Sequence, residues 1–237
     1  MTGRALLISL LLLMWGETAQ AGQTLQQVLD NMVEAYGGAE NLGKLDRMLQ
    51  EWEMFAPMRN THGMDLRYVQ VPGCLRVELT YPDKKEVRVL NGDRAQVSFD
   101  DTTPRYARPP QADAMRLQLM RLYSPLALRN RIADLELTED GGMLALSLEE
   151  NGLQTDYLVN PERWHIEKVT GTLEINGVRM RFLTEYSEFD MVGGVLVHHR
   201  ENKYAGNVNT ARLQLREVTF DVRHDRRLFE VTATPGL

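Results

Sequence analysis

The chain has 237 residues, a formal net charge of -6 and a pI near 5.5, and 43% of its residues are hydrophobic. This acidic balance, without a run of Lys and Arg, excludes the basic footprint of a nucleic-acid-binding protein and a polybasic patch for anionic membranes. A single cysteine, Cys74, excludes an internal disulfide, so packing must stabilise the fold.

The N-terminal residues 1–21 are typical of a secretory signal peptide. Arg4 supplies the positive charge, Ala5 to Trp15 the apolar segment and Ala19-Gln20-Ala21 the small-residue cleavage site. The apolar segment is shorter than the about 20 residues that span a bilayer, and no later stretch reaches that length. We therefore expect cleavage after Ala21 and a mature chain that is not an integral membrane protein. An uncleaved N-terminal anchor is the alternative.

A helix is predicted at the start of the mature chain. Thr24 and Gln27 have the spacing of a capping box. From Leu25 to Tyr36 the apolar residues fall on one arc of a helix, so this helix docks one face on the rest of the protein. Gly37-Gly38 ends the helix, because glycine accepts the left-handed backbone that closes it. Residues 39–46 resemble a second, shorter helical turn.

From Met48 the apolar period changes to two, which indicates strands. The residues predicted to share the inward face are Met48, Trp52 and Met54, then Met64, Leu66 and Tyr68, then Leu75, Val77, Leu79 and Tyr81. Asp65 and Arg67 are predicted to face outward between them. A further hairpin surrounds Asn91-Gly92, and the proline-containing segment Thr102 to Gln111 is predicted to be a loop.

A second helix is predicted in mid-chain, from Ala112 to Tyr123. Its apolar arc holds Met115, Met120 and Leu122 among others, with Asp113, Gln118 and Arg121 opposite. Methionine fills irregular or adaptable apolar surfaces. We expect this helix to cover the concave face of a curled sheet, either as permanent core or as a movable cover formed by Met115 to Tyr123.

Three strand-like runs follow between Met143 and Tyr186, joined at Asn151-Gly152 and Asn176-Gly177. Asn-Gly supplies the two positive φ values of a type I′ hairpin turn. The runs alternate, with Leu144, Leu146 and Leu148 on one face, and with Val178, Met180 and Phe182 on one face of the last run. The whole pattern predicts a mainly β (α+β) fold: a curled, unclosed antiparallel half-barrel with an N-terminal and a mid-chain helix over its concave apolar face. We expect residues 22–237 to form one domain.

The sequence shows no catalytic or metal-binding constellation. His198 and His199 are adjacent and would point to opposite faces of a strand, so we interpret them as surface or edge residues that do not chelate one ion. Serine-nucleophile motifs do not occur. We therefore expect neither an enzyme nor a cofactor.

Both ends of the predicted mature chain resemble one known family. Val28 to Leu49, with Ala35-Tyr36-Gly37-Gly38-Ala39, is similar to the N-terminal helix and glycine pair of the LolA-like superfamily, and Glu185 to Asp190, Gly194 to Val197 and Val218 to Val222 look like its C-terminal strands. The superfamily contains periplasmic outer-membrane lipoprotein carriers, sensors and glycolipid carriers. The resemblance implies a periplasmic protein with an unclosed barrel around helices and an apolar cavity for acyl chains. It carries no functional arginine over to this chain.

The expected function is therefore a periplasmic carrier of the outer-membrane lipoprotein-sorting type. It would hold a lipid or lipoprotein acyl chain, taken from an inner-membrane donor and passed to an outer-membrane acceptor protein. The residues predicted to line its cavity are Trp52, Met54, Leu66, Met115, Leu119, Leu122, Leu146, Met180 and Phe182. The alternative is an envelope sensor or adaptor with a self-filled sheet, which contacts a partner protein through an edge strand such as Arg212 to Val222.

Overall fold

The computed structural model describes residues 23–234, so the predicted signal peptide lies outside the described residues. The strands of this part form one thirteen-stranded antiparallel sheet in the order β6-β5-β4-β3-β2-β1-β13-β12-β11-β10-β9-β8-β7. Their bounds are β1 Arg47–Ala56, β2 Thr61–Gln70, β3 Cys74–Tyr81, β4 Lys84–Asn91, β5 Arg94–Phe99, β6 Arg105–Tyr106, β7 Leu135–Asp140, β8 Met143–Glu150, β9 Leu153–Val159, β10 Ile166–Ile175, β11 Val178–Val192, β12 Val195–Ala205 and β13 Val208–Phe220. The α-helices are α1 Leu25–Ala35, α2 Gly38–Leu42, α3 Gln111–Met120 and α4 Pro125–Arg129.

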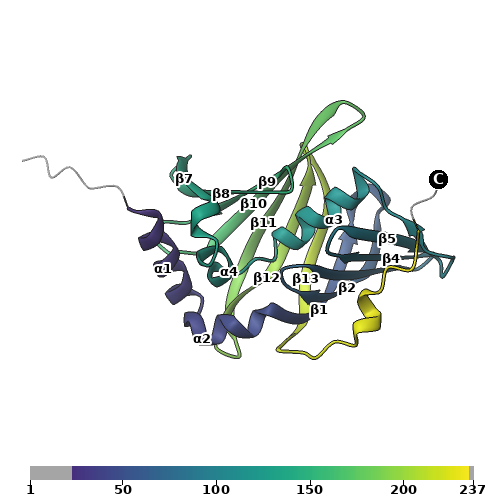
Figure 1. The fold of residues 1–237 in the computed structure, drawn as a ribbon, viewed down its shortest axis with the longest axis horizontal. Coiled ribbons are helices and arrows are strands. Elements are labelled where there is room, and N and C mark those ends of the chain that lie inside the picture. The colour runs from purple at the N-terminus through teal and green to yellow at the C-terminus, as the bar shows by residue number, and fades with distance from the viewer. Residues whose placement is uncertain (1–22, 235–237) are drawn as a thin grey trace, which may run out of the picture.

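The sheet is two meanders joined at a single place. Neighbouring strands follow one another in the chain except where β1 pairs with β13, with Met48 opposite Phe220. Among residues 23–234 the edge strands β6 and β7 do not pair with each other, and the sheet curves around α3 without closing (Figure 1). The predicted mainly β, unclosed antiparallel fold is confirmed. In this same part of the chain, no helix has both the length and the apolar composition to cross a bilayer.

The hairpin turns explain the register of the second meander. Asn151 and Gly152 have φ values of 54° and 74°, and Asn176 and Gly177 have 53° and 77°. These are the paired positive values of a type I′ turn, whose twist matches the flanking antiparallel strands. Both Asn-Gly predictions are confirmed.

Helix α1 covers one end of the concave face. Its capping box is formed as predicted, since Gln27 N donates to Thr24 Oγ1 at 3.2 Å and Thr24 N donates to Gln27 Oε1 at 2.9 Å. Val28, Leu29, Met32 and Val33 make up its buried face. The amphipathic pattern therefore docks α1 against the core.

Gly37 fixes the corner that follows α1. It has φ +106°, and a Cβ added to it would lie 2.0 Å from the carbonyl oxygen of Gly194 in the turn between β11 and β12. Beside it, Leu196 N donates to Tyr36 O at 3.1 Å. Glycine is therefore required at position 37, because the corner rests directly on this turn and places Tyr36 next to β12.

Helix α3 crosses the concave face and contacts strands of both meanders (Figure 1). It ends at Met120, earlier than predicted, because Ser124 accepts from Ala127 N and caps a new helix, α4, with Pro125 in its first turn. The expectation that Gln118 and Arg121 face solvent is wrong. Gln118 is buried, and both side chains line a pocket between α3 and the sheet.

The predicted orientation of β2 is also wrong. Asp65, Arg67 and Val69 are the buried residues of this strand, whereas Leu66 lies on the opposite face. The pairing with β1 places Asp65 opposite the fully buried Trp52, so the two side chains share the concave face. Charged partners inside the barrel favour this register over burial of Leu66.

Two smaller predictions need correction. The segment Arg212 to Val222 was expected to offer an exposed edge, but β13 lies in the middle of the sheet between β1 and β12. The predicted loop from Thr102 to Gln111 contains the edge strand β6, which pairs with β5.

Candidate functional site

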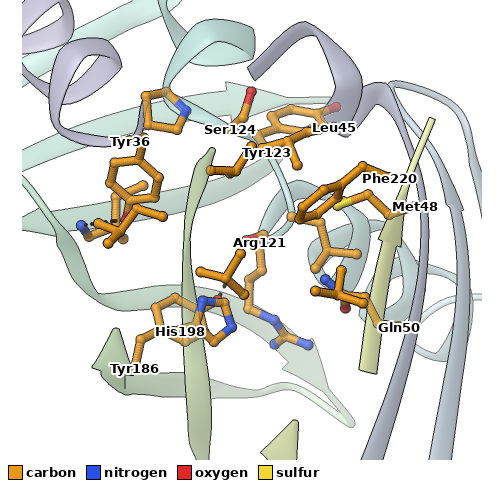
Figure 2. Close-up of a pocket in the computed structure, with 17 residues that line it drawn as sticks. Tyr36, Leu45, Met48, Gln50, Arg121, Tyr123, Ser124, Tyr186, His198 and Phe220 are labelled. Atoms are coloured by element: carbon orange, nitrogen blue, oxygen red, sulfur yellow. Dashed lines mark hydrogen bonds between the residues drawn. The ribbon is translucent and has the colours of Figure 1, made fainter. Parts of the chain in front are cut away.

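Two pockets lie on the concave face, and Arg121 lines both of them. The first, which we name the apolar pocket, has a volume of about 80 Å³ and lies between the α1 to α2 region, the connection from α3 to α4 and the strands (Figure 2). Its lining residues include Tyr36, Leu45, Met48, Leu122, Ile166, Val195, Leu196, Val197, Val218 and Phe220. Gln50, His198 and Arg121 add polar groups to this lining.

The second, which we name the mixed pocket, has a volume of about 340 Å³ and lies between α3 and the strands. Its apolar walls include Val77, Leu79, Leu117, Leu173 and Phe182. Charged and hydroxyl groups also line it: Asp65, Arg88, Arg121, Thr184 and Lys203. A pocket that is mostly apolar with a few converging polar groups is typical of small-molecule binding sites.

A buried ion network connects β2 with β12. Arg67, only 2% exposed, donates to Asp65 at 2.8 Å and to both carboxylate oxygens of Glu201 at 2.9 Å. Lys203 Nζ lies 3.1 Å from Glu201 Oε2. Because a buried charge is tolerated only when it is paired and hydrogen-bonded, these four residues depend on one another.

The network shifts the pKa of its members. Burial alone would raise the pKa of the Glu201 carboxyl, but Arg67 and Lys203 outweigh this effect and hold that pKa well below its ordinary value. Burial likewise opposes the charge of Arg67, and the carboxylates of Asp65 and Glu201 reverse the effect and raise its pKa. The carboxylate of Glu201 and the guanidinium of Arg67 are therefore both charged at neutral pH.

Aromatic rings pack beside this network. Trp52 lies with its ring 4.9 Å from the guanidinium carbon of Arg67, a cation–π contact. The imidazole of His198 stacks between Trp52 and Tyr186, with centroid distances of 5.6 and 4.1 Å, and its Nε2 lies 3.2 Å from Glu201. The interpretation of His198 as a surface or edge residue is wrong. No three His, Cys, Asp or Glu side chains within residues 23–234 are grouped so as to hold a metal ion.

Lys203 gives a testable pH dependence. Burial, followed by the charge of Arg67, lowers its pKa from 10.5 to about 8. Between these values the unfolded chain holds a proton that the folded protein has lost, so this residue makes stability rise with pH, by up to about 1.4 kcal/mol per pH unit. We expect the unfolding free energy of the wild type minus that of Lys203→Met to increase between about pH 8.5 and 9.5, measured by urea titration. Parallel pH profiles for the two proteins would contradict this.

The residues predicted to line an apolar cavity have three different surroundings. Four of them are packed in the core: Trp52, Met115, Leu119 and Leu146. Leu122 lines the apolar pocket, and Met54 and Phe182 line the mixed pocket. Leu66 lies on the other face of β2, and Met180 is half-buried and lines neither pocket.

Sequence reasoning missed the charged residues of the concave face. Asp65-x-Arg67 and Glu201-x-Lys203 both place opposite charges two residues apart, on one face of a strand. The same spacing occurs in the less buried pairs Arg76 with Glu78 and Glu86 with Arg88. Spacing alone therefore does not separate a buried pair from a solvated one.

Comparisons with known proteins identify the fold. Neither a protein-family model nor a curated protein matches this chain by sequence. A LolA superfamily protein from Nitrosomonas europaea matches it in structure with a TM-score of 0.56 and 13% identity, over 89% of this chain and 99% of that one. A domain from Vibrio parahaemolyticus, provisionally described as an outer membrane lipoprotein-sorting protein, has a TM-score of 0.52 and 8% identity, over 86% and 95%. A DUF1329 family protein from Desulfovibrio piger has a TM-score of 0.51 and 10% identity, over 86% and 95%.

At these identities the likeness establishes the fold alone. The chain has a LolA-like fold, as its sequence resemblance implied, and the shared architecture extends over most of its length.

Proposed function

We propose that this protein binds a lipid or lipoprotein acyl chain in the apolar pocket and acts as a non-enzymatic periplasmic carrier. The observation that supports this most directly is the pocket itself, which is lined by apolar side chains from β1, β12 and β13 and by the connection between α3 and α4. Each CH₂ group transferred from water to such surroundings contributes about 0.8 kcal/mol, so even part of an acyl chain supplies a useful free energy of binding. The likeness to a structure described as a lipoprotein-sorting domain points the same way.

Uptake of a whole acyl chain requires the pocket to widen. Its volume of about 80 Å³ has room for several water molecules but is small beside typical ligand pockets of about 300–1,000 Å³. The end of α3 is held to the sheet, because Tyr157 Oη donates a hydrogen bond to Met120 O at 2.8 Å. Helices α1 and α4 pack against each other, and an ion pair between Asp30 and Arg129 lies at the surface of this contact. We therefore assign the movement to α1, α4 and residues 122–125 rather than to the body of α3.

Filling the pocket should weaken binding of an acyl chain. Val218 on β13 is half-buried and lines the apolar pocket, so Val218→Trp places an indole where the acyl chain would lie. We expect at least a tenfold weaker affinity for a fluorescent fatty-acyl probe, and fewer lipids that copurify by mass spectrometry. The matched control is Val208→Trp on the same strand, because Val208 is 49% exposed and lines neither pocket.

Two results would contradict the proposal. One is a wild-type protein that takes up no acyl probe and copurifies with no lipid from its native compartment. The other is a folded Val218→Trp variant that binds the probe as tightly as the Val208→Trp control.

A second candidate function is an envelope sensor or adaptor, and the well-filled interior favours it. Met115, Leu119 and Leu146 are each at most 4% exposed, so most of the concave face is already covered by protein. The sheet edges do not favour strand addition, however, because β6 has only two residues and β7 exposes Glu136, Glu139 and Asp140. A partner protein captured by the wild type and equally by Val218→Trp, without lipid binding, would support this function instead.

A further inference from the structure

We propose that Arg121, Thr184 and Lys203 form a site for an anionic group, so that the ligand is an anionic amphiphile with a carboxylate or phosphate at this site and its chain in the apolar pocket. This inference rests on the proposed function and specifies the chemical class of ligand. Arg121 is the residue shared by the two pockets, and it therefore marks the junction between an apolar compartment and a polar one.

Within residues 23–234, no carboxylate pairs with the positive charge of Arg121. Within the network Arg67 and Lys203 balance Asp65 and Glu201, so these four residues are neutral together. No hydrogen bond or ion pair from residues 23–234 reaches the guanidinium of Arg121, although its backbone carbonyl accepts from Tyr186 Oη at 3.5 Å. Its side chain extends from the end of α3 toward Tyr186, His198 and Gln50 (Figure 2).

The carboxylates around the mixed pocket are already engaged by other cations. Asp65 and Glu201 both attract the charge of Arg121, but both are bound to Arg67. Glu86, on β4, is likewise paired with Arg88, which lines the mixed pocket. A half-buried cation without an anion gains strongly from one, since a charge-assisted hydrogen bond is about twice as strong as a neutral one.

Thr184 is an independent sign of a missing ligand atom. It is 1% exposed and lines the mixed pocket, yet its Oγ1 has no hydrogen-bond partner within the described chain. A buried hydroxyl without a partner is unfavourable, and native proteins rarely leave one. The pairing of β11 with β12 places Thr184 directly opposite Lys203, on the same face of the sheet. A hydroxyl donor and an ammonium donor therefore stand side by side in the pocket that Arg121 also lines.

The arrangement suits an amphiphile rather than a free anion. A chain in the apolar pocket would end at Arg121, and its head group would lie in the mixed pocket, where the volume of about 340 Å³ leaves space for it. A free anion would gain the polar contacts only, without burying any apolar surface.

The test compares palmitic acid with hexadecanol, two ligands of one chain length that differ in the charge of the head group. Each displaces a fluorescent acyl probe from the wild type, Arg121→Gln and Arg121→Lys. We expect the wild type to prefer the acid by at least about tenfold, the glutamine variant to lose that preference, and the lysine variant to keep part of it. Thr184→Val, which keeps the side-chain shape, should reduce the preference several-fold.

The outcomes separate this inference from the proposed function. If Arg121→Gln keeps the full preference for the acid, or if the wild type binds acid and alcohol equally, the anion site is overturned while the acyl carrier stands. If the wild type binds neither ligand, the proposed function itself fails. Inorganic phosphate alone should compete only weakly with the probe. If phosphate displaced the probe at the concentrations at which palmitic acid does, the inference that the ligand is an amphiphile would be overturned. Hexadecyl phosphate in place of palmitic acid shows which anionic group the site prefers.

Discussion

Replacing Arg67 by methionine should lower the unfolding free energy of this protein by about 3–5 kcal/mol, as removal of one partner from a buried ion pair usually does. The substitution keeps an apolar stem of similar length over Trp52 but leaves Asp65 and Glu201 without their guanidinium. Lys203 remains as the only cation of the network, and it faces mainly Glu201. Urea unfolding followed by tryptophan fluorescence measures the loss.

A matched control separates burial from charge. Like Arg67, Arg76 pairs with a carboxylate two residues away, in this case Glu78, but at a partly solvated position. The expected loss for Arg76→Met is at most about 1 kcal/mol, because solvent replaces the lost partner. Equal losses for Arg67→Met and Arg76→Met would contradict the argument.

The penalty of Arg67→Met should also depend on pH. In the wild type the lowered pKa of Glu201 stabilises the folded state above the ordinary pKa of a glutamate, and this contribution is lost as the pH falls below it. In the variant, burial without Arg67 raises the pKa of the Glu201 carboxyl, so the destabilisation is complete at neutral pH and is relieved as this unpaired carboxylate takes up a proton. The difference between the two proteins should therefore shrink between about pH 7 and pH 4.5. A constant difference over this range would show that lost packing, rather than unpaired charge, explains the effect.

Gly37→Ala should lower the unfolding free energy by about 2–5 kcal/mol. The left-handed backbone contributes about 1–2 kcal/mol of this, and the overlap of the new Cβ with the carbonyl oxygen of Gly194 contributes about 1–3 kcal/mol. The neighbouring Gly38→Ala is the control, because Gly38 also has a positive φ but a Cβ there would meet nothing within 4 Å. Its expected loss is only the backbone part, about 1–2 kcal/mol.

The same substitution should impair binding. The clash pushes the corner after α1 away from the turn between β11 and β12, and this corner carries Tyr36 while β12 carries Val195 to Val197, all of which line the apolar pocket. We expect Gly37→Ala to alter uptake of the acyl probe at temperatures where it is still folded, whereas Gly38→Ala should not. Thermal unfolding and probe titration on the same samples test both parts, and equal behaviour of the two variants would contradict the role of the close contact.

Local patterns predicted the elements of the fold well. The capping box at Thr24, the turns at Asn151 and Asn176 and the alternation of β3 each depend on neighbouring residues alone, and the structure confirms them. The interior of the site depends on residues far apart in the chain. Arg67 meets Glu201 across 134 positions, so the charges that decide the orientation of β2 could not be paired by reading the sequence.

The wrong prediction of which face of β2 is buried has a general physical reason. Met64, Leu66 and Tyr68 are as suitable for burial as the aliphatic residues of β3, and the hydrophobic pattern alone favours their side of the strand. Three charged residues buried together overcame that preference, because each satisfies the others and Trp52 packs against them. Departures from hydrophobic patterning of this kind are expected where a site requires polar groups inside a core.

The single junction between β1 and β13 has a consequence for how the protein is made. The two strands of each hairpin can pair as soon as both are synthesised. Strand β1, however, can pair with β13, Met48 opposite Phe220, only after β13 is synthesised, and until then β1 is the open edge of an incomplete sheet. Such an edge is a template for pairing with another nascent chain. The slow, long-range step of folding is therefore concentrated in one strand pair near the end of synthesis, and a chain truncated before β13 would lose the strand that joins the first meander to the second.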